Sequence, residues 1–127
     1  MNKYIMPIHF TVREKKIFLG MNWYKKTHWS SQNTSKKLYH EMVIDQLDNI
    51  LHNKIRLNIT LYIDKLTNKD LGNITSLHEK YFLDALVENK NLPDDCLKYY
   101  LGMHTDYIID KTIEIPYVCI EVLEVSE

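Results

Sequence analysis

Residues 69–95 read KDLGNITSLHEKYFLDALVENKNLPDD. Between residues 73 and 88 the apolar side chains recur at intervals of three and four, which predicts an amphipathic helix. Its apolar stripe consists of Ile74, Leu77, Tyr81, Phe82, Ala85 and Leu86. Asp70 and Asn73 lie where short polar side chains cap the first turn of a helix, and Pro93 is typical of the residues that follow one.

The same stretch carries acids at both ends and a lysine between them. Asp70 precedes the predicted helix, and Asp94 and Asp95 follow it. Lys80 and Asp84 lie one turn apart at the border of the apolar stripe, so they can pair along the helix. Each acid alone suits a cap or a solvated turn better than a metal site. Together they offer the carboxylate oxygens that Mg²⁺ prefers.

In this order the residues resemble the signature of the RusA family of Holliday-junction endonucleases, particularly its phage branch. The matching residues are Asp70, Gly72, Asn73, Lys80, Asp84, Ala85, Leu86, Asp94 and Asp95. The family has a second aspartate where this chain has Gly72. In the family, that aspartate forms the acidic centre together with the first one and the last of the Asp-Asp pair.

The resemblance implies a Mg²⁺-dependent endodeoxyribonuclease, with Mn²⁺ as a substitute, that cuts Holliday junctions or other branched DNA. It implies Asp70 and Asp95 as direct metal ligands, with Asp94 or Asp84 around them. Lys80 would join Asp70 and Asp95 as a catalytic residue by stabilising charge on the scissile phosphate. A four-way junction has two symmetry-related strands to cut, so a homodimer with one acidic site per subunit is implied. Service in phage recombination or packaging is also implied.

Gly72 leaves three alternatives open. A water molecule or a neighbouring acid, Asp64, Glu79 or Asp84, completes the metal coordination; the metal binds more weakly and still supports cutting; or the protein has kept the shape and lost the reaction. In the third case it binds branched DNA or a protein partner without cutting. A small interaction module whose acids are caps and turns is the alternative outside the family.

The charge of the chain is strongly polarised. Residues 1–40 carry eight Lys and Arg against one acid, a formal charge of +7, and residues 41–127 carry eight against sixteen, a charge of −8. A basic N-terminal third suits contact with phosphates, although charges on a protein surface also segregate by chance.

Residues 21–41 read MNWYKKTHWSSQNTSKKLYHE and have little periodicity, which predicts a long loop leading into a helix. This loop extends the resemblance, and the matching residues are Asn22, Tyr24, Lys25, Lys26, His28, Asn33, Lys36 and Lys37. All of them except Asn33 are predicted to bind DNA. Trp23 and Trp29 suit stacking on unpaired bases and anchoring a core or a dimer interface equally well.

The remaining patterns predict the fold. Strands are expected at 4–12, 17–19, 55–63, 99–109 and 117–125, and helices at 35–52 and 73–88. The strand at 55–63 alternates apolar and polar residues throughout. This order predicts one α/β (α+β) domain over residues 1–127, with a single mixed sheet and two main helices packed on it, similar to the RusA fold. The chain has no apolar run of membrane-spanning length and no signal-peptide pattern, so we expect a cytoplasmic protein without a membrane partner.

Overall fold

The computed structural model describes residues 3–47 and 51–125. The prediction of a mixed α and β fold is confirmed. In chain order the elements are β1 (Lys3–Pro7), β2 (His9–Val12), β3 (Lys15–Phe18), α1 (Met21–Lys26), α2 (Trp29–Ile44), β4 (Ile55–Ile63), α3 (Leu71–Glu88), β5 (Tyr100–Ile109) and β6 (Tyr117–Glu124).

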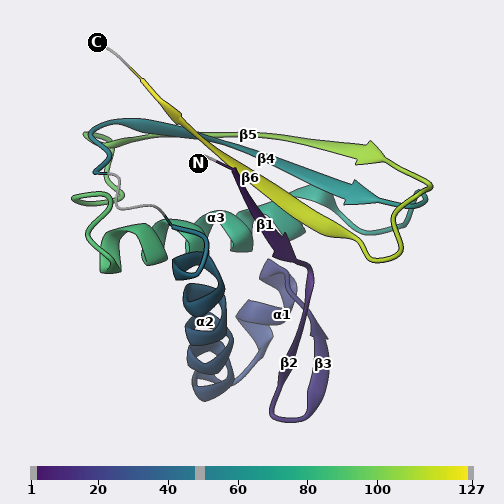
Figure 1. Ribbon diagram of the computed structural model, residues 1–127. Coiled ribbons are helices and arrows are strands. Elements are labelled where there is room, and N and C mark those ends of the chain that lie inside the picture. The colour runs from purple at the N-terminus through teal and green to yellow at the C-terminus, as the bar shows by residue number, and fades with distance from the viewer. Residues whose placement is uncertain (1–2, 48–50, 126–127) are drawn as a thin grey trace.

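Four strands form the main sheet in the order β1-β6-β4-β5 (Figure 1). β4 and β5 are parallel, whereas β6 is antiparallel to both of its neighbours. β2 and β3 form a separate antiparallel hairpin. The strand predicted at 55–63 is confirmed at both ends, because its alternate residues from Ile55 to Ile63 are buried. The strands predicted at 99–109 and 117–125 are each found within one residue.

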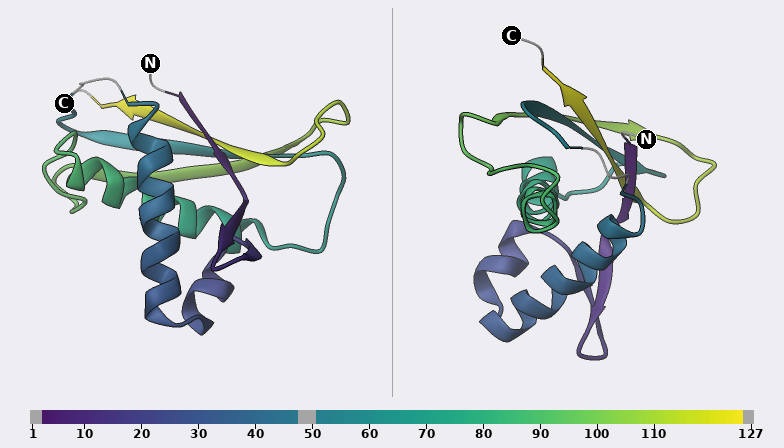
Figure 2. Two further views of the ribbon diagram at one scale, coloured as in Figure 1. Left: turned by 60° about the horizontal axis from the view of Figure 1, so that its bottom comes forward. Right: turned by 60° about the vertical axis from the view of Figure 1, so that its left-hand side comes forward.

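Helix α3 connects β4 to β5 and covers one face of the sheet (Figures 1 and 2). Asp70 caps its start by accepting a hydrogen bond from the Gly72 N–H at 3.0 Å, and it ends before Lys90, which has a φ of 63°. Along α3 only Gly72, Lys80 and Glu88 are exposed. The helix is therefore an interior element packed between the sheet and the other helices.

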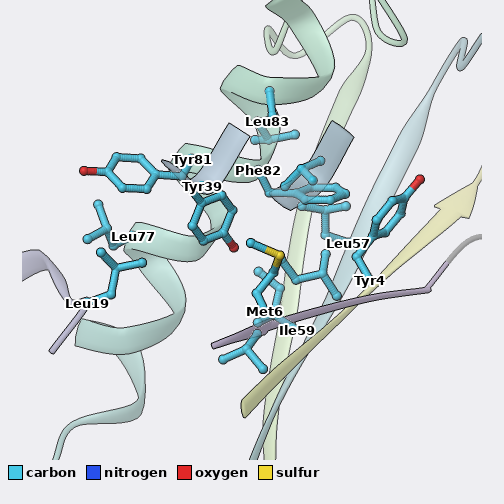
Figure 3. Packing of buried hydrophobic residues seen from close by; sticks show 14 of the residues in the cluster. Tyr4, Met6, Leu19, Tyr39, Leu57, Ile59, Leu77, Tyr81, Phe82 and Leu83 are labelled. Carbon is cyan, nitrogen blue, oxygen red and sulfur yellow. The ribbon is translucent and has the colours of Figure 1, made fainter. Parts of the chain in front are cut away.

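The core lies between the sheet and the helices. Figure 3 shows side chains of β1, β4, α2 and α3 meeting there, among them Met6, Leu57, Tyr39 and Phe82. The Tyr4 and Phe82 rings pack edge to face with their centroids 4.9 Å apart. Burying such side chains contributes about 1.5–3 kcal/mol each to the free energy of unfolding.

The long loop predicted at residues 21–41 is wrong, because α1 and most of α2 occupy it. No residue of α1 is buried, and the buried residues of α2 begin at Ser35, so residues 21–34 have little apolar periodicity to detect. Ser35 and Tyr39 are buried because their hydroxyl groups have partners on α3: Ser35 Oγ lies 2.7 Å from the Tyr81 hydroxyl, and the Tyr39 hydroxyl lies 2.7 Å from His78 Nδ1. Polar pairing replaces the apolar stripe that a sequence pattern would show.

Two further boundaries differ from the prediction. The helix predicted at 35–52 begins at Trp29 and ends at Ile44; residues 48–50 of that prediction lie outside the described residues. The strand predicted at 4–12 is divided at Ile8, so that β1 joins the main sheet and β2 pairs with β3. That division sends the hairpin away from the sheet.

His78 is fully buried in α3, and burial lowers its pKa to about 3. Its Nε2 has no hydrogen-bond partner among the described residues. The folded protein thus holds a neutral imidazole, whereas the unfolded chain takes up a proton below pH 6.5. Stability from this neutral group is complete above pH 6.5 and falls as the pH falls toward 3.

We predict that His78→Asn removes part of the acid sensitivity of the fold. In the natural protein this one group lowers the free energy of unfolding by about 1.4 kcal/mol per pH unit within that window. Urea denaturation at neutral and mildly acidic pH measures how steeply the free energy of unfolding changes with pH. The control is His28→Asn, which changes an exposed imidazole and keeps a good helix cap. Equal slopes for the two variants would contradict the prediction.

Candidate functional site

A basic lobe lies beside the main sheet. We define it as residues 9–37, which form the β2–β3 hairpin, α1 and the first half of α2; Figures 1 and 2 show them projecting away from the four-stranded sheet. The lobe has seven Lys and Arg and one acid, a formal charge of +6. Its exposed cations are Arg13, Lys15, Lys16, Lys25, Lys26 and Lys37. The charge polarity of the sequence is therefore a polarity in space.

A hollow of about 350 Å³ opens between the hairpin and the two helices of the lobe. It is lined by Val12, Arg13, Lys15, Ile17, Trp23, Thr27 and Ser31. Cations, hydroxyl groups and one large aromatic ring thus share one surface, which suits a phosphate and an unpaired base. The sequence singled out none of the four polar members, since Arg13 and Lys15 lie between the strands predicted at 4–12 and 17–19, and Thr27 and Ser31 lie in the predicted loop.

The hairpin tip holds Arg13 under backbone strain. Arg13 and Glu14 have φ values of 51° and 68°, in the left-handed region that non-glycine residues rarely adopt. A two-residue turn of this kind matches the twist of the strands, and Asn-Gly would form it at lower cost. The tip therefore keeps a cation at a position where its backbone conformation is unfavourable.

The predicted DNA-binding residues divide into exposed and engaged groups. Lys25 and Lys26 are exposed at the end of α1, and Lys37 is exposed on α2. His28 caps α2, since its Nδ1 accepts the Ser30 N–H at 3.1 Å. Lys36 lies 3.2 Å from Asp84 in an ion pair. The first three lysines are thus the most available for phosphate contact.

Lys36 and Lys37 also line a second hollow, of about 480 Å³, on α2. Glu41 and Glu88 share it, and His40 Nδ1 lies 3.0 Å from the Glu88 carboxylate. These acids offset the lysines. The hollow is therefore a weaker phosphate site than the surface at the end of α1.

Asn22 and Tyr24 hold α1 against α3. The Asn22 N–H donates to Asn73 Oδ1 at 2.7 Å, and a Cβ atom on Gly20 would lie 2.6 Å from the Asn73 amide nitrogen. The Tyr24 ring packs against Tyr81 at 6.0 Å. Asn73, which matches the family motif, thus has a structural role in positioning the basic lobe.

Lys80 also belongs to this contact. Its Nζ lies 5.8 Å from the centre of the Tyr24 ring, and its side chain is exposed on the face that α3 turns toward α1. Lys80 is ten residues after Asp70, a rise of about 15 Å along a helix. The lysine and the carboxylate are therefore separated along α3 and do not touch.

The start of α3 places Asp70 beside the basic lobe. Asp70 is exposed, and its neighbour Lys69 lies 3.9 Å above the Phe18 ring of β3. Burial, Lys16 and Lys69 lower the pKa of His9 on β2. A carboxylate thus projects at the point where the helix meets a surface of positive charge.

The acids predicted to form one metal site are not brought together in a single chain. Asp70 precedes α3 and Asp94 and Asp95 follow it, and this helix has 18 residues, a length of about 27 Å. Asp84 lies near the far end, paired with Lys36. Among residues 3–47 and 51–125, no group of three or more His, Cys, Asp and Glu side chains lies close enough to hold a metal ion.

The neighbouring acids do not complete the set either. Glu79 accepts a hydrogen bond from the Tyr100 hydroxyl, and with burial this contact raises the pKa of that tyrosine. Asp64 is half-buried at the end of β4, six residues before Asp70. Within the described residues, neither acid therefore joins Asp70 in a group of three or more possible metal ligands.

Gly72 leaves room for the acid that the family carries. It is exposed, and a Cβ atom there would meet only Asp70 Oδ1, at an ordinary 3.5 Å. Its backbone conformation does not require glycine, since its φ is not positive. An aspartate at position 72 would therefore project beside Asp70 without distorting the helix.

None of the helices in the described part of the chain is long and apolar enough to cross a membrane. No model of a known protein family matches the chain, and no curated protein matches it significantly. The resemblance to the RusA family accordingly rests on the motif residues named above.

Proposed function

We propose that this protein acts on branched DNA as a RusA-like, Mg²⁺-dependent endonuclease selective for structures such as Holliday junctions. The observation that carries the proposal is the position of Asp70. This exposed carboxylate stands at the end of α3 that contacts the basic lobe, through Lys69 on Phe18 and Asn73 on Asn22. Phosphates held by the lobe would lie next to a potential metal ligand.

The lobe would supply most of the affinity for DNA. Lys25, Lys26 and Lys37 are exposed on two adjoining helices, and Arg13 and Lys15 line a hollow of the same lobe together with Trp23. Cations on several elements can follow phosphates that diverge at a branch point, and a ring in a hollow can stack on a base that has lost its partner. Preference for a junction over a duplex would arise from this curved, mixed surface.

Hydrolysis of a phosphodiester needs an activated water and neutralisation of charge on phosphorus, and a carboxylate-bound Mg²⁺ or Mn²⁺ supplies both. Because the described part of one chain contains no group of three or more possible metal ligands, we propose that a second copy contributes part of the site. This changes the expectation of one complete acidic site per subunit.

The second candidate is a RusA-like protein that binds branched DNA or a protein partner without cutting. Two observations favour it. Gly72 stands where the family carries an aspartate, and the Asp84 carboxylate forms an ion pair with Lys36. Both candidate functions rely on the basic lobe for binding, and they differ in whether the acidic residues support cutting.

Binding of a synthetic four-way junction and of a linear duplex with the same sequence tests the part that both candidates share. We expect the junction to be bound more tightly, with an affinity that falls steeply as salt is raised. Fluorescence anisotropy over a salt series measures both quantities. Absence of binding at low salt, or equal affinity for the two DNAs, would contradict the proposal.

We predict that Gly72→Asp raises junction cutting by tenfold or more, because it restores a second carboxylate beside Asp70 at no steric cost. The control is Gly72→Asn, which has the same size and no charge. Cleavage of a labelled junction at limiting Mg²⁺ measures the rates. If the aspartate and asparagine variants cut alike, the predicted role of this position is wrong.

A further inference from the structure

The two edge strands of the main sheet differ in whether their outward backbone groups have hydrogen-bond partners. At the β1 edge the side-chain amide of Gln46 acts as a strand would: the Ile5 N–H donates to its Oε1 at 2.9 Å, and its Nε2 donates to the Ile5 carbonyl at 3.1 Å. At the other edge β5 pairs with β4, and no second strand of the described residues joins it. One edge is closed from within the chain, and the other offers a row of backbone groups for pairing.

The open edge also exposes apolar side chains. Tyr107, Ile108 and Ile109 are 47%, 44% and 43% exposed. A register shift between the Ile55 and Leu57 pairings, with Gly102 at a φ of 105°, marks a bulge near the start of β5. Bulges protect edges, but this one leaves Met103–Ile109 in regular register with β4. Seven residues of regular strand therefore present an unprotected edge.

The sequence of β5 is complementary to itself. We propose that β5 pairs antiparallel with β5 of a second copy about a two-fold axis at Thr105. In this register Thr105 faces the partner's Thr105, His104 faces the partner's Asp106, and Met103 faces the partner's Tyr107. Residues opposite each other in an antiparallel pair point to the same face. The two-fold axis therefore gives two His–Asp pairs on the outer face and two Met–Tyr pairs on the helix face.

The contact that competes with this pairing lies within β5 itself. The Asp106 carboxylate accepts the Tyr107 N–H at 2.8 Å and is exposed to solvent. In the pair, this carboxylate turns to His104 of the second copy. The dimer exchanges a local, solvated hydrogen bond for the backbone hydrogen bonds of a strand pair and two His–Asp contacts, which favours the pairing.

The pairing also explains how the separated acids would meet, which rests on the proposed function. Lys69 and Leu71, on either side of Asp70, line a hollow of about 200 Å³ with Tyr107 near the end of β5. At the start of β5, the Tyr100 N–H donates to the backbone carbonyl of Cys96 at 2.9 Å, and Cys96 follows Asp95 in the chain. Antiparallel pairing sets the start of one β5 beside the end of the other. Asp95 of each copy and the partner's Asp70 then lie at the same end of the joined sheet.

A charge-swap experiment tests the interface independently of DNA. His104→Asp places two carboxylates opposite one another twice, and Asp106→Lys removes the acceptor of both His–Asp contacts, whereas the double variant places a carboxylate opposite an ammonium group twice. Lys3→Glu, a charge reversal on the exposed face of the other edge strand, is the control. Light scattering coupled to size exclusion, over a concentration series, measures the mass against 15.2 kDa for one chain.

We expect a dimer for the natural chain, the control and the double variant, and a dissociation constant raised about tenfold for each single variant. A single-chain mass for the natural protein at every concentration would overturn the proposal, whether or not the protein binds DNA. Single variants that dimerise like the natural chain, or a double variant that fails to recover, would overturn it as well. A dimer with the expected swap pattern supports the interface even if no DNA is bound or cut, in which case the proposed function alone would fail.

Discussion

Lys25→Glu/Lys26→Glu is expected to abolish most DNA binding while leaving the fold intact. Both side chains are exposed at the end of α1, and neither has an ion-pair partner among the contacts of the described residues. If each lysine neutralises one phosphate, their loss reduces the slope of log affinity against log salt by about 1.8. At about 50 mM salt, affinity falls by roughly 100-fold.

The matched control is Lys98→Glu/Lys111→Glu, which changes the net charge equally at exposed positions outside the basic lobe. Anisotropy titration of a labelled four-way junction compares the two double variants, and thermal unfolding verifies that both are folded. If the control weakens binding as much as the lobe variant, net charge and not the lobe controls affinity. The proposed interface would then be wrong.

An equal mixture of Asp70→Asn and Asp95→Asn copies is expected to recover junction cutting that neither variant has alone. If each site takes Asp70 from one copy and Asp95 from the other, a mixed dimer contains one site with both lesions and one site with neither. Random exchange makes half of the dimers mixed, so about one quarter of the natural sites return. Each mixed dimer would nick one strand and would not make paired cuts.

The alternative arrangement predicts the opposite result. If both acids act within one copy, every site in the mixture carries a lesion, and no activity returns. The natural protein and each variant alone are assayed beside the mixture, after incubation at a concentration that allows subunits to exchange. Recovery would support the composite site, and its absence beside an active natural protein would contradict it.

The sequence predicted those helices and strands whose buried side chains recur as apolar residues at regular intervals. β4 alternates without interruption, and α3 buries a continuous apolar stripe, so both were found nearly to the residue. α1 and the first six residues of α2 were missed, because none of their side chains is buried and they leave no apolar pattern in the sequence. The helix predicted from residue 35 overlaps the rest of α2, where Ser35, Tyr39 and His40 have polar partners on α3.

The candidate site was predictable as a set of residues and not as a geometry. Asp70, Lys80 and Asp95 stand in the order that the family motif requires, but their order along the chain does not determine the distances between their side chains. The helix between the two acids has 18 residues and is about 27 Å long, and this length is known only once the ends of the helix are known. The hollow with Arg13 and Trp23 depends on the hairpin folding back over α1, a contact between elements that no local pattern records.

Cutting of an end-labelled four-way junction, beside a linear duplex of the same sequence, tests the central claim most directly. The assay is run with Mg²⁺, with Mn²⁺ and with a chelator. We predict metal-dependent, symmetrically paired nicks in the junction, an intact duplex, and loss of cutting in Asp70→Asn. A junction that is bound and left uncut with either metal would contradict the endonuclease and leave a branched-DNA-binding protein in its place.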